Sequence, residues 1–278
     1  AILTIVIGIS MAVLDGAIAN VALPTIATDL HATPASSIWV VNAYQIAIVI
    51  SLLSFSFLGD MFGYRRIYKC GLVVFLLSSL FCALSDSLQM LTLARVIQGF
   101  GGAALMSVNT ALIRLIYPQR FLGRGMGINS LIVAVSSAAG PTIAAAILSI
   151  ASWKWLFLIN VPLGIIALLL AMRFLPPNGS RASKPRFDLP SAVMNALTFG
   201  LLITALSGFA QGQSLTLIAT ELVVMVVVGI FFIRRQLSLP VPLLPVDLLR
   251  IPLFSLSICT SVCSFCAQML AMVSLPFY

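Results

Sequence analysis

Long apolar stretches, separated by short polar connections, alternate along almost the whole chain. A helix that crosses a bilayer needs about 20 predominantly apolar residues, and stretches of this length recur between charged or proline-containing breaks. The pattern therefore predicts membrane-spanning helices at residues 2–24, 38–58, 67–86, 89–112, 126–149, 155–174, 190–209, 215–235 and 253–277.

Composition excludes a soluble protein. Hydrophobic residues make up 61% of the chain and charged residues 8%, whereas soluble domains average about 45–50% apolar and about 25% charged residues. A net charge of +8 would favour a nucleic-acid partner in a soluble protein, but here the basic residues lie in the connections between spans. We therefore expect an all-α integral membrane protein in contact with lipid, with no nucleic acid as a partner.

Three of the five cysteines, Cys259, Cys263 and Cys266, share one stripe of the last predicted span. A metal site there would need further ligands, and no histidine or carboxylate lies nearby. Cysteine acting as a small hydrophobe is the better interpretation. The single histidine, His31, lies in a polar connection and is interpreted as a solvated residue. We expect neither a metal nor a cofactor.

Basic residues are distributed unevenly between the connections. Those after the second, fourth, sixth and eighth spans hold 13 of the 15 lysines and arginines, whereas those after the odd-numbered spans hold only Lys154. Cytoplasmic loops of membrane proteins carry an excess of basic residues. The asymmetry therefore predicts a multi-pass protein with its N-terminus in the cytoplasm.

Two polar breaks divide the chain. The first, rich in Pro, Gly, Ser and basic residues, is typical of a solvated linker, and the second is rich in proline and partly apolar. The breaks predict a six-helix domain, a cytoplasmic linker, an inserted helical pair, a second cytoplasmic connection and a ninth span at residues 1–175, 176–189, 190–236, 237–252 and 253–278.

The fourth predicted span carries a polar stripe inside an apolar helix. At about 100° per residue, one face presents Arg95, Gln98, Gly102, Met106 and Asn109. A guanidinium at membrane depth costs at least about 2.5 kcal/mol, so it is expected to face a water-filled cavity or a carboxylate. The alternative is an arginine that extends to the lipid headgroups.

A carboxylate lies at a matching depth. With a rise of about 1.5 Å per residue, Asp15 lies about 13 Å from the outer end of the first span and Arg95 about 9 Å from the outer end of the fourth. An ion pair between them is therefore possible. The pattern does not show whether the two spans touch.

The loop SFLGDMFGYRR at residues 56–66 combines a carboxylate, a glycine and two arginines. Gly63 permits a tight turn, and Asp60 can accept charge-assisted hydrogen bonds or face the positive end of a helix. Together with Arg65 and Arg66 it suits a contact that forms in one conformation and breaks in another. A generic charged turn is the alternative.

This loop resembles the signature between helices 2 and 3 of the major facilitator superfamily, with Ser56 and Met61 departing from the pattern. Residues 95–104 resemble the helix-4 motif of that family, which is tied to proton coupling, and Gly140-Pro141 resembles its helix-5 antiporter motif. Leu14-Asp15 with residues 20–24, and WKWLFLINVPLG at residues 153–164, are similar to its fourteen-helix drug:proton antiporter branch.

The resemblance implies two six-helix domains that rock about a central site, in a multidrug efflux transporter of the bacterial plasma membrane. This chain would then hold the first domain, the inserted pair and the first helix of the second domain. Both ends lie inside apolar runs, so a longer protein is expected. The implied gating residues are Asp60, Gly63, Arg65, Arg66, Gly140 and Pro141.

The leading proton carrier is Asp15. Burial disfavours a charged carboxyl group and a nearby cation favours it, so Asp15 could take a proton when it separates from Arg95, and a cationic substrate could compete for its charge. A static ion pair is the alternative. Glu221, the internal charge of the inserted pair, is a second candidate, with a structural or headgroup-facing role as its alternative.

Polar or adaptable side chains within the spans are the candidates for the substrate cavity. Interhelical hydrogen bonding or simple packing is the alternative for each of them. They are Asn20, Asn42, Gln45, Gln98, Met106, Asn109 and Asn129.

The favoured function is proton-coupled export of amphipathic, often cationic compounds by a monomer that uses the proton gradient and no cofactor. A metabolite transporter on the same scaffold is the alternative. A membrane enzyme is disfavoured because the seven acidic residues are scattered singly. A purely structural subunit would leave the Arg95 stripe unexplained.

Overall fold

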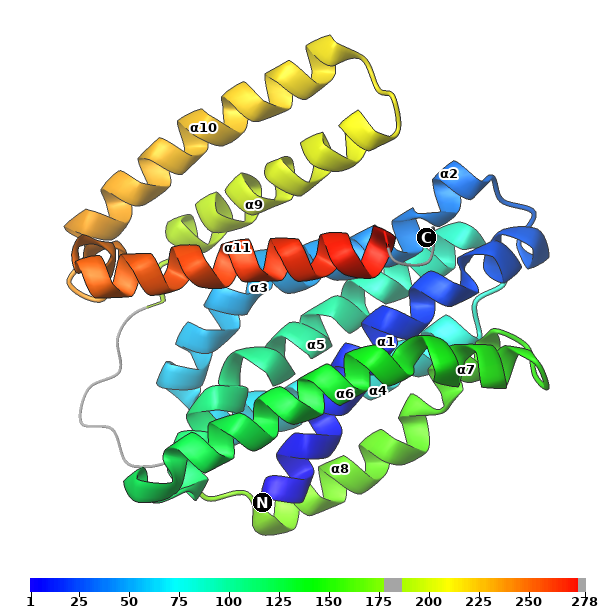
Figure 1. The fold of residues 1–278 in the computed structure, drawn as a ribbon, viewed down its shortest axis with the longest axis horizontal. Helices are drawn as coiled ribbons and strands as arrows, with labels where there is room; N and C mark the ends of the chain where they lie inside the picture. The colour runs from blue at the N-terminus through cyan, green and yellow to red at the C-terminus, as the bar shows by residue number, and fades with distance from the viewer. Residues whose placement is uncertain (178–186, 275–278) are drawn as a thin grey trace.

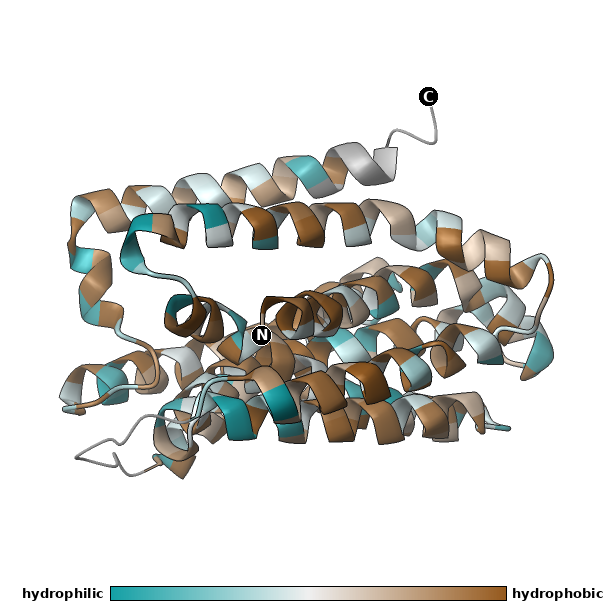
Figure 2. Cartoon of the chain, turned by 90° about the horizontal axis from the view of Figure 1, so that it is seen from below, coloured by the Kyte–Doolittle hydropathy of each residue, from teal (hydrophilic) through white to brown (hydrophobic). Residues whose placement is uncertain are grey.

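The computed structural model describes residues 1–177 and 187–274, and every regular element in that part of the chain is a helix (Figure 1). Eight of these helices are long and apolar enough to cross a membrane, and hydrophobic residues cover most of their length (Figure 2). The main helices are α1 (Ile2–Asp29), α3 (Trp39–Phe62), α4 (Tyr64–Ala83), α5 (Leu88–Ile116), α6 (Leu122–Leu148), α8 (Asn160–Phe174), α9 (Leu189–Ala210), α10 (Leu215–Ser238) and α11 (Pro252–Ser274).

Short helices complete the connections. They are α2 (Pro34–Ser37), η1 (Gln119–Phe121), α7 (Lys154–Leu158) and η2 (Val246–Arg250). Each predicted span corresponds to one observed helix or helix pair, which confirms the all-α membrane fold. For the ninth span, the described apolar stretch is Pro252–Gln268, shorter than the other eight. Residues 178–186 of the predicted linker and residues 275–278 lie outside the described residues.

Helix α5 lies between α3 and α4, and two glycines let it approach both closely. A Cβ atom built at Gly99 would lie 2.7 Å from the Tyr44 carbonyl oxygen of α3. One built at Gly101 would lie 2.7 Å from the backbone nitrogen of Phe75 in α4. Small residues allow such close backbone contacts in membranes. Gly99 and Gly101 therefore make α5 the central helix of the bundle.

The sixth predicted span is interrupted rather than continuous. It consists of α7 and α8, which meet at Ile159. Pro162 has no N–H to donate to the carbonyl group of Leu158, so one helical hydrogen bond is missing at this point. The interruption places Asn160, the first residue of α8, in the interior, where it is 4% exposed.

In the inserted pair, α9 packs beside α3 and α10 packs against α9 (Figure 1). Asn195 of α9 donates to the Ile50 carbonyl oxygen at 2.9 Å, and Asn42 of α3 donates to Ser207 at 3.3 Å. Helix α11 follows the pair and makes its main contacts with η2. The pair is thus fastened to the six-helix bundle through one helix.

Candidate functional site

A buried ion pair joins α1 and α5 at the centre of the bundle. Arg95 donates through Nη1 to Asp15 Oδ2. The Arg95 side chain is 0% exposed and that of Asp15 is 1% exposed. The structure therefore brings together the two residues of opposite charge that the predicted spans place at similar depth in the membrane.

Two amide side chains complete the environment of the Asp15 carboxylate. Its Oδ1 atom accepts from Gln98 Nε2 at 3.0 Å and from Asn160 Nδ2 at 2.9 Å. Gln98 also donates to Ser79 Oγ at 2.8 Å. Asp15, Ser79, Arg95, Gln98 and Asn160, here called the Asp15 cluster, connect α1, α4, α5 and α8. Both carboxylate oxygens are satisfied, as a buried charge requires.

Helix α3 holds the guanidinium group of Arg95 from the other side. Its Nε atom donates to the Val40 carbonyl oxygen at 3.0 Å, and Nη1 also donates to Gln98 Oε1 at 2.7 Å. The guanidinium carbon lies 4.0 Å from the ring centroid of Tyr44, within the range of a cation–π interaction. Arg95 Nη2 is buried without a hydrogen-bond partner among the described residues.

The stripe of α5 faces the interior of the bundle. Arg95, Gln98 and Asn109 are at most 4% exposed. Asn109 donates to Asn129 Oδ1 of α6 at 2.7 Å, and Met106 is half-buried. Arg95 therefore pairs with a carboxylate, one of the two environments expected for a guanidinium group at membrane depth. It does not extend to the lipid headgroups.

The remaining residues predicted for a cavity are not gathered at one place. Asn42 bonds to α9 as described above. Asn20 is exposed and donates to the Gly16 carbonyl oxygen of its own helix at 3.1 Å, and Gln45 is exposed on α3. The interhelical hydrogen bonds expected as an alternative are thus observed for Asn42 and Asn109.

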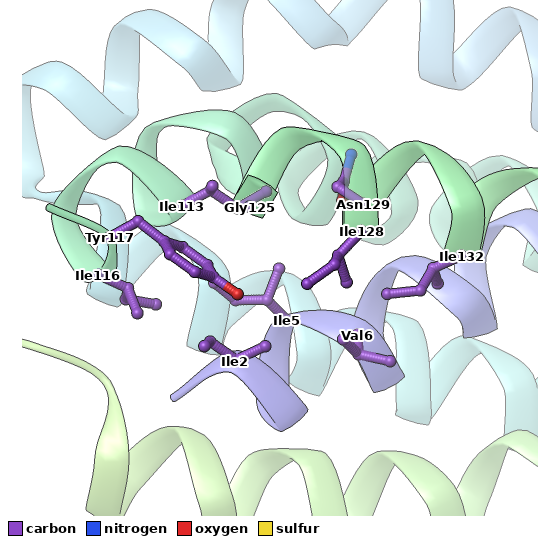
Figure 3. Close-up of a pocket in the computed structure, with 10 residues that line it drawn as sticks. All are labelled: Ile2, Ile5, Val6, Ile113, Ile116, Tyr117, Gly125, Ile128, Asn129 and Ile132. Carbon is purple, nitrogen blue, oxygen red and sulfur yellow. The ribbon is translucent and has the colours of Figure 1, made fainter. Parts of the chain in front are cut away.

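Asn129 also borders a small pocket between α1, α5 and α6 (Figure 3). Ile2, Ile5 and Val6 line it from α1, and the Tyr117 ring extends toward them from the end of α5. Its volume is about 20 Å³, which is room for about one water molecule. The pocket is too small for an amphipathic drug in this conformation.

The predicted gating loop forms a tight turn between α3 and α4. Gly63 has φ = 94°, a left-handed conformation that favours glycine, and ends α3. Tyr64 Oη donates to Asp60 Oδ1 at 2.5 Å, and Arg65 donates to the Met172 carbonyl oxygen of α8. Arg66 is exposed. The loop therefore links the ends of α3, α4 and α8.

The predicted antiporter motif lies where α6 crosses α1. A Cβ atom at Gly140 would lie 2.5 Å from the Ala17 Cβ atom, so only glycine allows this approach. Pro141 lies inside α6. Glu221, the second candidate for proton coupling, is half-buried in α10, away from the Asp15 cluster. Its Oε2 atom is buried without a hydrogen-bond partner among the described residues.

Sequence reasoning missed Asn160, Ser79 and Tyr44. Tyr44 lies in α3 and Ser79 in α4, and nothing in the sequence marks either of them as a neighbour of the α5 stripe. Asn160 had a usable signal, because an asparagine two residues before a proline inside an apolar span indicates a helix interruption with a polar group to satisfy. Its contact with Asp15 depends on the packing of α8 against α1, which the periodicity of one helix does not reveal.

Comparison with known proteins shows extensive similarity. The family model described as Major Facilitator Superfamily matches residues 5–278. The chain is 99% identical over 278 residues to the Escherichia coli (strain K12) protein named "Uncharacterized transporter YebQ", with 100% of this chain and 61% of that protein covered.

Two more distant relatives carry functional names. The chain is 30% identical over 277 residues to the riboflavin transporter RibZ of Clostridioides difficile (strain 630), covering 100% of this chain and 60% of RibZ. It is 36% identical over 204 residues to the putative multidrug resistance protein MdtD of Salmonella paratyphi B, covering 73% of this chain and 43% of MdtD. The chain spans about 60% of the length of the first two relatives.

Proposed function

Since the chain belongs to the major facilitator superfamily, a family of transport proteins rather than enzymes, we propose that the whole protein exports amphipathic, often cationic compounds in exchange for protons. The exchange proceeds by alternating access. Asp15 carries the proton in this proposal, and Arg95 is its counter-ion. The observation that carries the proposal is the Asp15 cluster, in which a carboxylate and a guanidinium are buried together inside the bundle.

The cluster can couple proton binding to helix movement because the charge of Asp15 holds it together. The ionised carboxylate accepts hydrogen bonds from α5 and α8. Protonation would leave Arg95 as a buried cation without a counter-ion, and removing one partner of a buried ion pair costs about 3–5 kcal/mol. We expect protonation to separate α1 from α5 and α8.

Substrate enters the same cycle only after the cluster opens. Asp15 is 2% exposed, so a cationic compound cannot reach it in this conformation. In an open conformation the compound and the proton would compete for one negative charge, which gives exchange. The loops rich in arginine, which the positive-inside rule places in the cytoplasm, fix the orientation of the protein in the bacterial inner membrane, and the inward proton gradient then drives export.

Relatives support two substrate classes. The name of the MdtD relative favours drugs or toxic compounds. The riboflavin transporter matches the whole of this chain, which favours a small metabolite as the second candidate. The two candidates differ in the compounds transported and share the scaffold.

Proton flux in inside-out vesicles that contain the full-length protein tests the proposal. Addition of a cationic dye such as ethidium to vesicles with an acidic interior should drive uptake of the dye and release of protons. Asp15→Asn should abolish both at unchanged expression. Lys154→Gln is the matched control, because it removes an exposed ion pair with Asp86 and leaves the cluster intact.

Three outcomes distinguish the candidates. Full proton-linked transport by Asp15→Asn would overturn the role of Asp15. Transport of riboflavin but of no cationic dye would favour the metabolite transporter. Dye transport without proton release would overturn the antiport mechanism.

A further inference from the structure

The seam between α9 and α10 contains an apolar groove of about 470 Å³ that the transport mechanism does not use. The first turns of α9 line one side, from Leu189 to Leu197, and Val228 and Phe231 of α10 line the other. Its seven lining residues are all apolar. The groove is therefore suited to a hydrocarbon chain.

The groove opens away from the six-helix bundle. Asn195 of α9 points to α3, where it donates to Ile50. Val193 and Leu197 each lie two residues from Asn195, which is about 160° around the helix. They are 49% and 47% exposed. This face of the pair is therefore uncovered in the described part of the chain.

One end of the groove lies at the end of both helices, where basic residues gather. Leu189 is the first residue of α9, and Arg234 follows Phe231 by three residues, on the same face of α10. Arg234 is exposed. Arg235 pairs with Asp188 through Nε and Nη2 at 2.8 Å each, which leaves its Nη1 outside the pair. Among these three described residues, one positive charge is uncompensated.

We propose that the groove binds an anionic phospholipid, with one acyl chain along the seam and its phosphate on Arg234. Basic pockets between membrane helices attract anionic headgroups, and the depth agrees because the arginines stand at the helix ends. From Leu189 to Leu197 the groove runs about 12 Å, too short to seat a spanning helix of a second copy. The proposal is independent of the transported compound.

Native mass spectrometry of the full-length protein in detergent tests the site. Phosphatidylglycerol and phosphatidylcholine with identical acyl chains are added separately, and bound lipid is counted. Phosphatidylglycerol should be retained preferentially, and Arg234→Gln should weaken its binding about fivefold, the effect of about one arginine near an anionic surface. Arg124→Gln removes another exposed arginine, in the first turn of α6, and should change nothing.

A second pair of variants tests the groove itself. Val193→Trp with Leu197→Trp fills it from exposed positions, so the fold is retained and the bound phosphatidylglycerol is lost. Leu206→Trp, at a residue that is 62% exposed nearer the other end of α9, is the control.

Equal retention of the two lipids, or equal effects of Arg234→Gln and Arg124→Gln, would overturn the proposal. So would a dimer that Val193→Trp dissociates, because a second copy would then occupy the groove.

Discussion

The chain uses the same pair of charged groups in two very different surroundings. Asp15 and Arg95 pair inside the six-helix bundle, with side chains 1% and 0% exposed. Asp188 and Arg235 pair at the end of the inserted helices, with side chains 19% and 38% exposed. The chemistry is the same, so the difference between the two sites comes from burial.

Solvent can compensate for the loss of a partner at the exposed pair, whereas each member of the buried pair depends on its protein partners. Water can replace either partner at the exposed pair. The hydrogen bonds that Arg235 donates to Asp188 lower the pKa of that carboxyl group to about 2. Inside the bundle no solvent replaces a lost partner. Breaking an exposed pair therefore costs little, whereas breaking a buried pair is costly because it leaves an uncompensated charge.

Removing one partner of the buried pair should have the largest effect. Asp15→Leu or Arg95→Met should each destabilise the protein by about 3–5 kcal/mol, because an uncompensated buried charge remains. The double variant should recover most of that stability while proton-coupled transport stays lost. Thermal unfolding in detergent and vesicle transport measure the two properties. A double variant as unstable as the single ones would contradict this account.

The two regions should also differ in how they tolerate a methyl group. Gly101→Ala places a Cβ atom 2.7 Å from the α4 backbone, and overpacking of this kind costs about 1–3 kcal/mol. Gly200→Ala in α9 is the matched control, since its nearest neighbour, in Ile50, is at 3.8 Å. Thermal unfolding should show a loss for the first variant and none for the second. Equal losses would mean that the pair is packed as tightly as the bundle.

An effect of similar size on stability is expected from α8, which contributes Asn160 to the cluster. Asn160→Ala removes one of the two donors to Asp15 Oδ1. The loss should lower the free energy of unfolding by about 1–3 kcal/mol, because a buried polar group then lacks a hydrogen-bond partner. Asn195→Ala is the control, because it removes a buried asparagine bond outside the cluster. Both should reduce stability, whereas only Asn160→Ala should also slow proton release in vesicles. Equal transport by the two variants would exclude a positioning role.

The smallest effect belongs to the exposed pair. The pKa of Asp188 is lowered from 3.8 to about 2, so its contribution is complete above pH 4 and is lost as the pH falls toward 2. Wild-type protein should therefore lose slightly more thermal stability between pH 5 and pH 3 than Asp188→Asn does. Thermal scans at stepped pH measure this. Identical pH dependence of the two proteins would show that the pair contributes nothing.

The sequence predicted the helices well and the cluster only in part. Apolar length determines where spans lie, because the hydrocarbon core has one thickness. Depth along two helices also put Asp15 and Arg95 at the same level. The helix face that meets a neighbour depends on packing, so the sequence did not reveal that Gln98, a candidate for the substrate cavity, donates to Asp15.

Long-range partners were the part that could not be predicted. Asn160 lies 145 residues from Asp15, and its inward position follows from the interruption between α7 and α8. Asn42 illustrates the same limit, because its partner Ser207 belongs to the inserted pair. Polarity within a span indicated that these residues need partners, and the three-dimensional arrangement of helices decides which partners they find.

The closure of the Asp15 cluster has a consequence for leakage. A membrane that stores energy as a proton gradient is harmed by any protein that lets protons through without work. Under the proposed mechanism, Asp15 exchanges protons no faster than the bundle opens, because its side chain is only 1% exposed while the cluster is closed. The same contacts that hold the carrier would then act as an insulator, and an idle transporter would not discharge the membrane.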